Sequence, residues 1–442
     1  MASRLRGDLG DHQVEVPPVL NRSGWALAGL FLLAVGLRIV CNPEPATLAG
    51  DAAGYHQRAV DLSAGRGYLD ADGRPTAFKA PGYPFFLSGI YRLFGQNHRA
   101  VVWIQALLGG IVVLAGAALG RRIGGCPAGW LTGLLIAVSP PLVRLSGTLL
   151  TENLALFLLM LMGWLGGVWA DRRHLLRAIV WGILCAALVL TRPGMGLLVP
   201  AAAAAAAWHR LRRPGPESGR LLRQVLCAGV IACSLIGLWT IRNHRQLGRW
   251  VPISTDGGRA LYSAVIPLDG VRYGFSADDA AARRIDRLPD EVDRDRAYRR
   301  AAWDRLRRAP GRLPAILGLR LGTLLVPWDW EIIARDGTAR YNWLYGLLFP
   351  WILWGAWQIR RTGHAVVLIG IPLGVLLLQT LLFYGSPRFR LPFEPFLLLL
   401  GALGWIAFWG ERRPVRWKAG LGIGWGLLQA VGAGMIARWR GW

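Results

Sequence analysis

The residues that could do chemistry in this chain stand at the edges of long apolar stretches. Asp51 follows the first of these stretches and lies directly after Gly50. A carboxylate in that place could act as a general base and remove the proton from a hydroxyl group that attacks a lipid-linked substrate. The structural alternative for the same residue is capping of a helix N-terminus.

A second acid, Glu152, begins a later apolar stretch directly after Thr151, and we expect it on the same membrane face as Asp51. It could position a substrate or hold a metal ion. Alternatively, Thr151 and Glu152 only cap and stabilise a helix N-terminus. We therefore treat Asp51 and Glu152 as candidate catalytic residues.

Five basic residues stand in segments that we expect outside the membrane, against the usual bias of positive charge toward the cytoplasm. Lys79 lies in the segment Lys-Ala-Pro-Gly-Tyr-Pro, where its amine could bind the phosphate of a lipid carrier or contact ordinary head groups. Each arginine could likewise anchor head groups, but together they could form a converging anion site for a polyprenyl phosphate. These candidates are Lys79, Arg192, Arg242, Arg388 and Arg390; candidate substrate-pocket residues are Tyr55, His56, Tyr83 and Asn243.

The composition indicates what kind of protein carries these residues. Of the 442 residues, 53% are hydrophobic and 17% are charged, whereas a soluble domain carries roughly a quarter charged residues. The apolar residues form long blocks, which excludes a soluble enzyme, a disordered chain and a disulfide scaffold and predicts a multi-pass membrane protein. The net charge of +25 lies mainly in clusters between these blocks. This distribution of basic residues indicates that they orient the protein in the membrane and do not bind nucleic acid.

Several catalytic signatures are absent from the sequence, which contains no GxxxxGK[ST], HExxH, GxSxG or paired CxxC motif. Nucleotide hydrolysis, zinc proteolysis and serine hydrolysis therefore have no support. The five cysteines are an odd number and lie mostly in or beside apolar blocks, so they indicate neither a disulfide framework nor a metal cage.

Hydropathy predicts an all-α, polytopic transmembrane helix bundle with about 11 or 12 spans and two periplasmic loop segments that carry short helices. Arginine-rich connectors place the N-terminus in the cytoplasm and the first long loop outside. The segment 313–328 is short and carries Arg320 in its middle, so we interpret it as interfacial or re-entrant. The predicted blocks are 25–40, 100–119, 130–143, 154–169, 178–190, 194–208, 221–241, 343–357, 365–384, 391–409 and 420–436.

We divide the chain into four parts: a cytoplasmic tail (1–23), a seven-span catalytic module (24–241) that includes a periplasmic loop (41–99), a periplasmic or interfacial segment (242–341), and C-terminal transmembrane helices (342–442). One soluble helix is predicted from about 290 to 308 in the third part. Its first turn is acidic and its last turn is basic, as the helix dipole favours, and Pro310-Gly311 ends it.

The order of these motifs resembles bacterial membrane glycosyltransferases of the GT-C type. It resembles more closely the family 39 enzymes related to protein O-mannosyltransferases and to the aminoarabinose transferase of lipid A. The resemblance implies a GT-C fold with a shared seven-span module, periplasmic loops that carry the active site, and a lipid-phosphate sugar donor. The features that carry it are Asp51, the 79–84 segment, Thr151-Glu152, the Trp-Thr-Ile-Arg-Asn run at 239–243, the Ser-Thr-Asp-Gly-Gly turn at 254–258, and Arg-Phe-Arg-Leu-Pro at 388–392.

The resemblance also implies residue roles. Asp51 matches the catalytic acid of the first loop, and Lys79 resembles the lysine that contacts carrier phosphate in the lipid A transferase. Glu152 resembles an acid that opens the fourth span, and Arg242-Asn243 resembles a pair after the seventh span. No cofactor is expected; use of a divalent metal is in doubt, because Asp51 stands alone where several relatives have paired acids. The chain ends soon after its last span, so we expect no large periplasmic domain to recognise the acceptor.

Together these observations predict an inverting glycosyltransferase of the bacterial cytoplasmic membrane. It would move a monosaccharide from a polyprenyl-phosphate carrier to a lipid, protein or polysaccharide acceptor on the periplasmic side. The alternative is a transporter or flippase for a lipid-linked sugar, a class that usually places polar residues at mid-membrane and often shows paired repeats. A catalytically silent assembly subunit stays open as well. The expected partners are the donor, the acceptor and membrane lipids, without nucleic acid.

Overall fold

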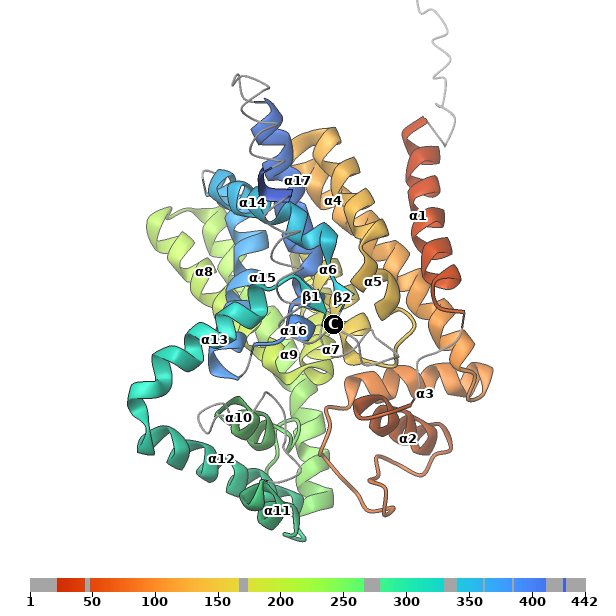
Figure 1. The fold of residues 1–442 in the computed structure, drawn as a ribbon, viewed down its shortest axis with the longest axis vertical. Coiled ribbons are helices and arrows are strands. Elements are labelled where there is room, and N and C mark those ends of the chain that lie inside the picture. The colour runs from red at the N-terminus through yellow and green to blue at the C-terminus, as the bar shows by residue number, and fades with distance from the viewer. Residues whose placement is uncertain are drawn as a thin grey trace, which may run out of the picture.

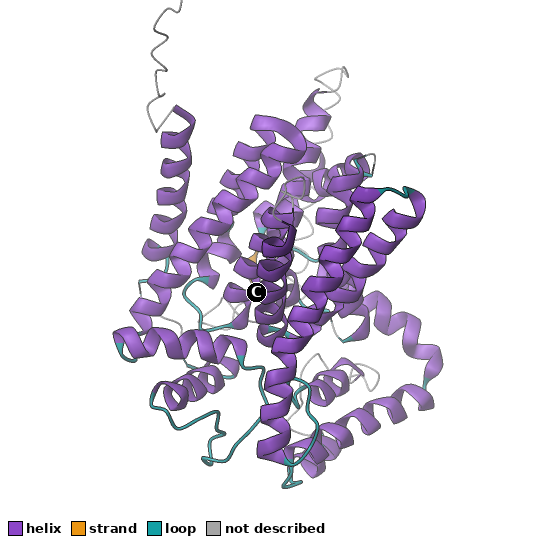
Figure 2. Cartoon of the chain, turned by 180° about the vertical axis from the view of Figure 1, so that it is seen from behind, coloured by secondary structure: helices purple, strands orange, loops and turns teal. Residues whose placement is uncertain are grey.

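The computed structural model in Figure 1 shows a bundle of long helices with shorter helices gathered at one end. The structure describes residues 22–43, 48–166, 174–265, 279–329, 340–360, 362–383, 385–410 and 424–426. Within them, regular structure is almost entirely helical (Figure 2), apart from the short antiparallel pair β1 (Trp328–Asp329) and β2 (Arg340–Tyr341). The predicted all-α helix bundle is confirmed within these residues.

The bundle consists of helices that are apolar over most of their length. α4, α6 and α17 enclose a core in which Phe393, Phe396 and Ile136 are fully buried. The bundle helices are α1 (Arg22–Val40), α4 (His98–Val138), α6 (Thr151–Gly166), α7 (His174–Thr191), α8 (Leu198–Arg212), α9 (Pro216–Leu247), α14 (Trp343–Ile359), α15 (Gly363–Leu382) and α17 (Glu394–Gly410).

By length and composition, four helical stretches of the described chain can cross a membrane. They are His98–Val138, Pro216–Leu247, Ala365–Leu382 and Pro387–Gly410, and three shorter apolar helices are Gly24–Val40, Thr151–Gly166 and Leu175–Thr191. The chain is thus a multi-pass membrane protein, whereas the count of about 11 or 12 spans, the orientation and the four-part division stay predictions. The tail 1–23 and the block 420–436 lie almost wholly outside the described residues.

α4 contains the predicted block 100–119 and most of the block 130–143 in one helical element, but the second block was predicted too long, because α4 ends at Val138 and α5 (Pro140–Leu145) begins after Ser139. The helical geometry breaks between them at Gly124 (φ −126°, ψ 15°) and Gly125 (φ 80°, ψ −176°). The positive φ of Gly125 is a conformation that a residue with a Cβ rarely adopts. The two blocks therefore form the two arms of a helix that is kinked at a glycine pair.

α14 and α17 approach each other so closely that glycine is required on both helices. A Cβ at Gly355 would lie 2.0 Å from the Leu400 carbonyl oxygen, and a Cβ at Gly404 would lie 1.9 Å from the Trp351 carbonyl oxygen. Small residues allow such backbone contact between membrane helices, where van der Waals packing stabilises association. This contact fixes α17 against α14.

The shorter helices lie below the bundle in the view of Figure 1. The predicted helix at about 290–308 is confirmed as α12 (Glu291–Arg308). The Asp290 carboxylate caps its N-terminus by accepting hydrogen bonds from the backbone N–H groups of Val292 and Asp293. α12 ends at Arg308, just before Pro310-Gly311, as expected. This group comprises α2 (Asp51–Ser63), α3 (Gly82–Phe94), α10 (Gly257–Val265), α11 (Ala280–Asp286) and α12 (Glu291–Arg308).

Short elements connect the bundle to these helices. One of them, α13, holds the buried Arg320, whose guanidinium donates to the carbonyl oxygens of Leu381 and of Ala264, the latter at 3.0 Å. Whether the 313–328 segment is interfacial or re-entrant stays a prediction. The connecting elements are α5 (Pro140–Leu145), η1 (Pro193–Leu197), η3 (Pro310–Arg312), α13 (Leu313–Leu325), α16 (Pro387–Arg390) and η4 (Leu391–Phe393).

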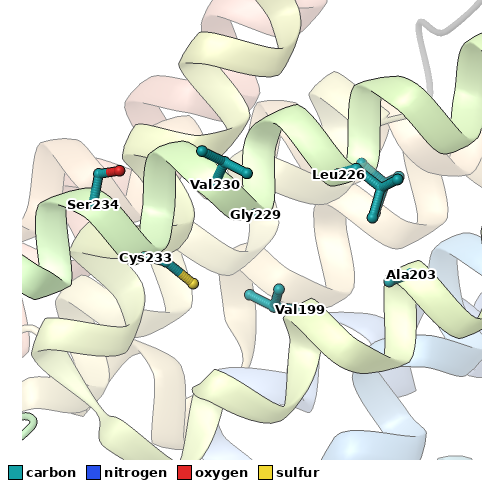
Figure 3. A pocket seen from close by; sticks show the side chains of 8 residues that line it. Val199, Ala203, Leu226, Gly229, Val230, Cys233 and Ser234 are labelled. Atoms are coloured by element: carbon teal, nitrogen blue, oxygen red, sulfur yellow. The ribbon is translucent and has the colours of Figure 1, made fainter.

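A shallow apolar groove of ≈ 540 Å³ runs between α8 and α9 (Figure 3). Val199 and Ala203 line it from α8, and Leu226, Val230 and Cys233 line it from α9. The groove contains no charged side chain. It therefore suits lipid or helix packing and is distinct from the polar site described next.

Candidate active site

Six charged side chains from distant parts of the chain meet at the base of the bundle. Asp51, the first residue of α2, lies 3.0 Å from Lys79 Nζ and 2.9 Å from Arg388 Nη1. Arg388 also donates to Glu152 through Nε, and Arg192 Nη1 lies 2.8 Å from the same Glu152 oxygen. We call the whole set the charged cluster: Asp51, Lys79, Glu152, Arg192, Asp256 and Arg388.

Asp256 is the one member that sequence reasoning did not place among the site residues. Its Oδ2 accepts a hydrogen bond from Lys79 Nζ at 2.8 Å. The residue lies in the Ser-Thr-Asp-Gly-Gly turn and directly precedes α10. An acid beside glycine, as at Asp51, was the signal that could have identified it.

Two glycines let the first loop approach the bundle. Gly50 has a φ of 55° where the chain turns into α2. A Cβ at Gly82 would lie 2.5 Å from Thr191 Oγ1 and 2.8 Å from the Thr191 nitrogen. Only glycine therefore allows the segment after Lys79 to pack against the end of α7, where Arg192 follows.

The charged cluster is buried on one side and open on the other. The Glu152 side chain is 0% exposed, whereas the side chains of Asp51 and Asp256 are 31% and 33% exposed. Three carboxylates face three permanent or nearly permanent cations, so the formal charges of the six residues cancel. A small molecule or head group could reach Asp51, Asp256 and Lys79 from the open side.

The cluster fixes the charge of its members outside the membrane spans. Burial acts to raise the pKa of Asp51, but the charges of Arg388 and Lys79 and their hydrogen bonds outweigh it and lower that pKa to about 2. Burial acts to lower the pKa of Lys79, but Asp256, Tyr55 and Asp51 outweigh it and raise that pKa above its ordinary value. Both groups are therefore charged at neutral pH.

The three aromatic candidates have different surroundings. Burial raises the pKa of Tyr55 to about 12, and this residue interacts with Lys79 and Asp51, so a neutral phenol borders the cluster. Tyr83 packs edge-to-face on Tyr55 at 5.5 Å. Its hydroxyl donates to Gln105 Oε1 at 2.9 Å. His56 belongs to another group, since its Nδ1 lies 2.9 Å from the hydroxyl of Tyr91 and 3.3 Å from Nε2 of His98.

Arg242 and Asn243, at the end of α9, hold loop backbone and lie outside the charged cluster. The Arg242 guanidinium donates to the carbonyl oxygens of Thr76 at 2.6 Å and Tyr68 at 2.9 Å. Asn243 Nδ2 donates to the Val251 carbonyl oxygen at 2.9 Å. The contacts show these two residues ordering the first and second loops around the site.

Glu291 is a second residue that sequence reasoning treated only as a helix-end acid. Its carboxylate accepts from Thr76 Oγ1 at 2.5 Å and from the Ala77 backbone N–H at 2.7 Å. It therefore binds the first loop two and three residues before Lys79, from a helix more than 200 positions later in the chain. No sequence pattern points to such a contact.

Arg390 also lies apart from the charged cluster, although Arg388 on the same short helix is a member. Its Nη1 donates to the carbonyl oxygens of Leu324 and Val326 at 2.9 and 2.8 Å. Its guanidinium lies over the Tyr345 ring at 3.9 Å, and its Nε lies 3.7 Å from Glu394. The Arg390 guanidinium thus belongs to a fully buried network beneath the site.

The donor set of the cluster does not fit a divalent metal ion. Each carboxylate contacts a lysine or an arginine. In the described part of the chain, no three His, Cys, Asp or Glu side chains are grouped to hold a metal. Metal sites for Ca²⁺, Mg²⁺ or Zn²⁺ instead bring several acidic or imidazole ligands together.

Comparison with known families supports the resemblance noted in the sequence. Residues 78–239 match the family described as dolichyl-phosphate-mannose-protein mannosyltransferase. The matched range contains Lys79, Glu152 and Arg192. No curated protein matches the chain in sequence.

Solved structures show the same fold. The oligosaccharyltransferase of Archaeoglobus fulgidus complexed with Zn and sulfate matches with a TM-score of 0.55 and 14% identity, over 92% of this chain and 51% of that one. The archaeal oligosaccharyltransferase AglB from the same organism, complexed with an inhibitory peptide and a dolichol-phosphate, matches with a TM-score of 0.55 and 12% identity, over 93% and 55%. This chain spans about half the length of those proteins. A structure of ArnT from Cupriavidus metallidurans in the apo state matches less well, with a TM-score of 0.42 and 18% identity, over 88% of this chain and 79% of that one.

Proposed function

We propose that this protein is an inverting glycosyltransferase that moves a monosaccharide from a polyprenyl-phosphate carrier to an acceptor hydroxyl. Its site would face the periplasm, at the outer surface of the bacterial cytoplasmic membrane. The observation that carries the proposal is the contact of the Asp51 carboxylate with Lys79 and Arg388 at the open side of the charged cluster. A carboxylate and two cations therefore lie within one small volume, as a base and a phosphate-binding pair would require.

The relatives support a lipid-phosphate donor. The matching family is named for dolichyl-phosphate-mannose, and one oligosaccharyltransferase of the same fold is complexed with a dolichol-phosphate. In this chain, the partly exposed amine of Lys79 and guanidinium of Arg388 are the cations best placed to bind such a phosphate. Arg192 lies further inside, against buried Glu152.

In the proposed reaction each group has a task in a single displacement. Asp51 accepts the proton of the acceptor hydroxyl while the hydroxyl oxygen forms a bond to the anomeric carbon. The bond from that carbon to the phosphate oxygen breaks, and the electron pair leaves with the carrier phosphate. Lys79 and Arg388 stabilise the charge that develops on this phosphate. Attack from the face opposite the leaving group inverts the anomeric centre.

The low pKa of Asp51 belongs to the protein without substrate. A carboxyl group with a pKa of about 2 is always ionised at neutral pH but binds a proton weakly. A carrier phosphate that shares Lys79 and Arg388 adds negative charge beside Asp51, which raises its proton affinity. The base would therefore become stronger when the donor is bound.

The test is Asp51→Asn in liposomes with a labelled lipid-linked sugar. We expect turnover to fall at least about 100-fold, because amide nitrogen and oxygen cannot accept the proton. Asp72→Asn is the matched control, since Asp72 is an exposed acid of the same loop. Near-normal turnover of the Asp51 variant would remove it from the base role.

The same assay separates transfer from transport. A glycosyltransferase releases carrier phosphate without its sugar, whereas a flippase moves the intact carrier between leaflets. Both products can be distinguished by chromatography of the extracted lipids. Recovery of only intact carrier would contradict the proposed transfer.

A further inference from the structure

Lys79 is held between two carboxylates that come from different loops. Its Nζ lies 3.0 Å from Asp51 and 2.8 Å from Asp256. A backbone hydrogen bond from the Thr255 N–H to the Ala77 carbonyl oxygen, at 3.0 Å, aligns the two loops beside this contact. The register of the loops therefore sets Asp256 opposite Lys79.

The three carboxylates of the charged cluster are not held equally. Glu152 is fully buried between Arg192 and Arg388, and Asp51 contacts both Lys79 and Arg388. Within the described residues, the Asp256 carboxylate has a single ion-pair partner, Lys79, and it is 33% exposed. Asp256 is thus the acid of the cluster that can move away from its cation at least cost.

Binding of a phosphate would disturb the charge balance of the cluster, and displacement of one acid from its cation would relieve the repulsion. The six residues of the cluster carry three negative and three positive charges, so a phosphodiester would bring one uncompensated negative charge. Like charges placed side by side in a partly buried site are strongly unfavourable. A phosphate oxygen can replace a carboxylate oxygen on the Lys79 amine without changing the number of its hydrogen bonds.

We propose that Asp256 is the displaceable counter-ion of Lys79. Its carboxylate pairs with the Lys79 amine when no donor is bound, and the phosphate of the carrier takes its place on that amine when the donor binds. This inference rests on the proposed function. Asp256 is a positioning residue that acts through Lys79. After transfer, its return to Lys79 favours release of the carrier phosphate.

The experiment measures binding rather than turnover. Purified full-length protein in nanodiscs is titrated with a polyprenyl phosphate, and affinity is read by native mass spectrometry or by a fluorescent analogue. We expect Asp256→Asn to bind about tenfold more tightly than the wild type, because one repulsive charge beside the phosphate is removed. Asp256→Glu, which keeps the charge, should restore weaker binding.

Two further variants make the test specific. Asp304→Asn removes one negative charge from the exposed surface of α12 and should leave affinity unchanged. In a Lys79→Gln background, Asp256→Asn should lose most of its effect, because the two residues act as a pair. Turnover under saturating donor should be lower in Asp256→Asn, since release of the product is slower.

The outcomes separate this inference from the proposed function. If wild type and Lys79→Gln both fail to bind polyprenyl phosphate, the proposed function is overturned. If wild type binds, Lys79→Gln weakens binding, and Asp256→Asn binds equally or more weakly than wild type, only the role of Asp256 is overturned. Size-exclusion chromatography of each variant shows whether it is folded, and retained binding in Asp256→Glu shows that this position tolerates substitution.

Discussion

At the scale of single residues, the site depends on how each charge is partnered. Glu152 has no access to solvent and neutralises parts of two guanidinium groups, those of Arg192 and Arg388. A buried acid of this kind is costly to remove, because the cations that remain are left without compensation in a medium of low polarity.

We therefore expect Glu152→Gln to lower the free energy of unfolding by about 3–5 kcal/mol, the usual cost of breaking a buried ion pair. Thermal unfolding followed by fluorescence-detected size-exclusion chromatography would measure it. Glu217→Gln, at the exposed start of α9, is the matched control and should change stability little. Equal stability of the two variants would show that Arg192 and Arg388 do not need Glu152.

Residue type and position in the sequence identified Asp51, Lys79, Glu152, Arg192 and Arg388 as candidates, and the structure brings these five together. Their catalytic and binding roles stay proposals. The same reasoning could not separate Arg388 from Arg390, two residues apart, because the direction of each side chain depends on packing against α13 and α6. Sequence reasoning also could not predict that the Arg242 guanidinium would donate its hydrogen bonds to backbone carbonyl groups.

At the scale of elements, the first loop is ordered by helices that follow it much later in the chain. Arg242 at the end of α9 and Glu291 at the start of α12 bind the backbone between Tyr68 and Ala77 from two directions. Lys79 lies just beyond that stretch. The position of its amine therefore depends on both helices.

Glu291→Ala should loosen the first loop without unfolding the bundle. We expect faster hydrogen–deuterium exchange in residues 68–80 and a KM for the lipid-linked donor raised about 5- to 10-fold, with a smaller change in kcat, because a well-made charged hydrogen bond contributes about 1.5–3 kcal/mol. Thr76→Val, which removes one of its donors, should reproduce part of the effect.

Asp293→Ala is the control, since it removes an acid from the same turn of α12 that pairs only weakly with Arg296 at 3.8 Å. Its exchange pattern should match that of the wild type in residues 68–80. Identical patterns for the Glu291 and Asp293 variants would mean that α12 does not position the loop.

Elements differed in how well sequence predicted them. α12 was placed to within one residue, because capping and dipole signals are local. The contacts of α12 with the first loop were not foreseen, because they join segments more than 200 residues apart and depend on the tertiary fold. The hydropathy blocks located α14, α15 and α17, but could not show the glycine kink that joins two blocks in α4.

At the scale of the whole molecule, the short helices α2, α3, α10, α11 and α12 lie at one end of the bundle (Figure 1). α1 ends on the side of these helices, whereas the kink of α4 at Gly124 and Gly125 follows the first arm of that helix away from α3. Cys41 follows α1 on the side of the short helices, and Cys126 lies beside the kink; both are exposed. Arg121 and Arg122, next to the kink, favour the cytoplasmic side.

We expect an impermeant maleimide to label Cys41 in intact cells and to label Cys126 only after permeabilisation. The measurement uses two variants that each keep one of these cysteines, with Cys185, Cys227 and Cys233 replaced by alanine. Labelling in the reverse order would place the site in the cytoplasm and would contradict the proposed topology.

The glycine contact between α14 and α17 has a consequence for how such a protein can diversify. A Cβ at Gly355 or at Gly404 would overlap the backbone of the facing helix, so a larger residue at either position would push α14 and α17 apart. New acceptor preferences would instead arise by changes in the two loops that carry Asp51 and Asp256, whose side chains are partly exposed. Gene duplicates with unlike targets should therefore differ most in those two loops and least at this glycine pair.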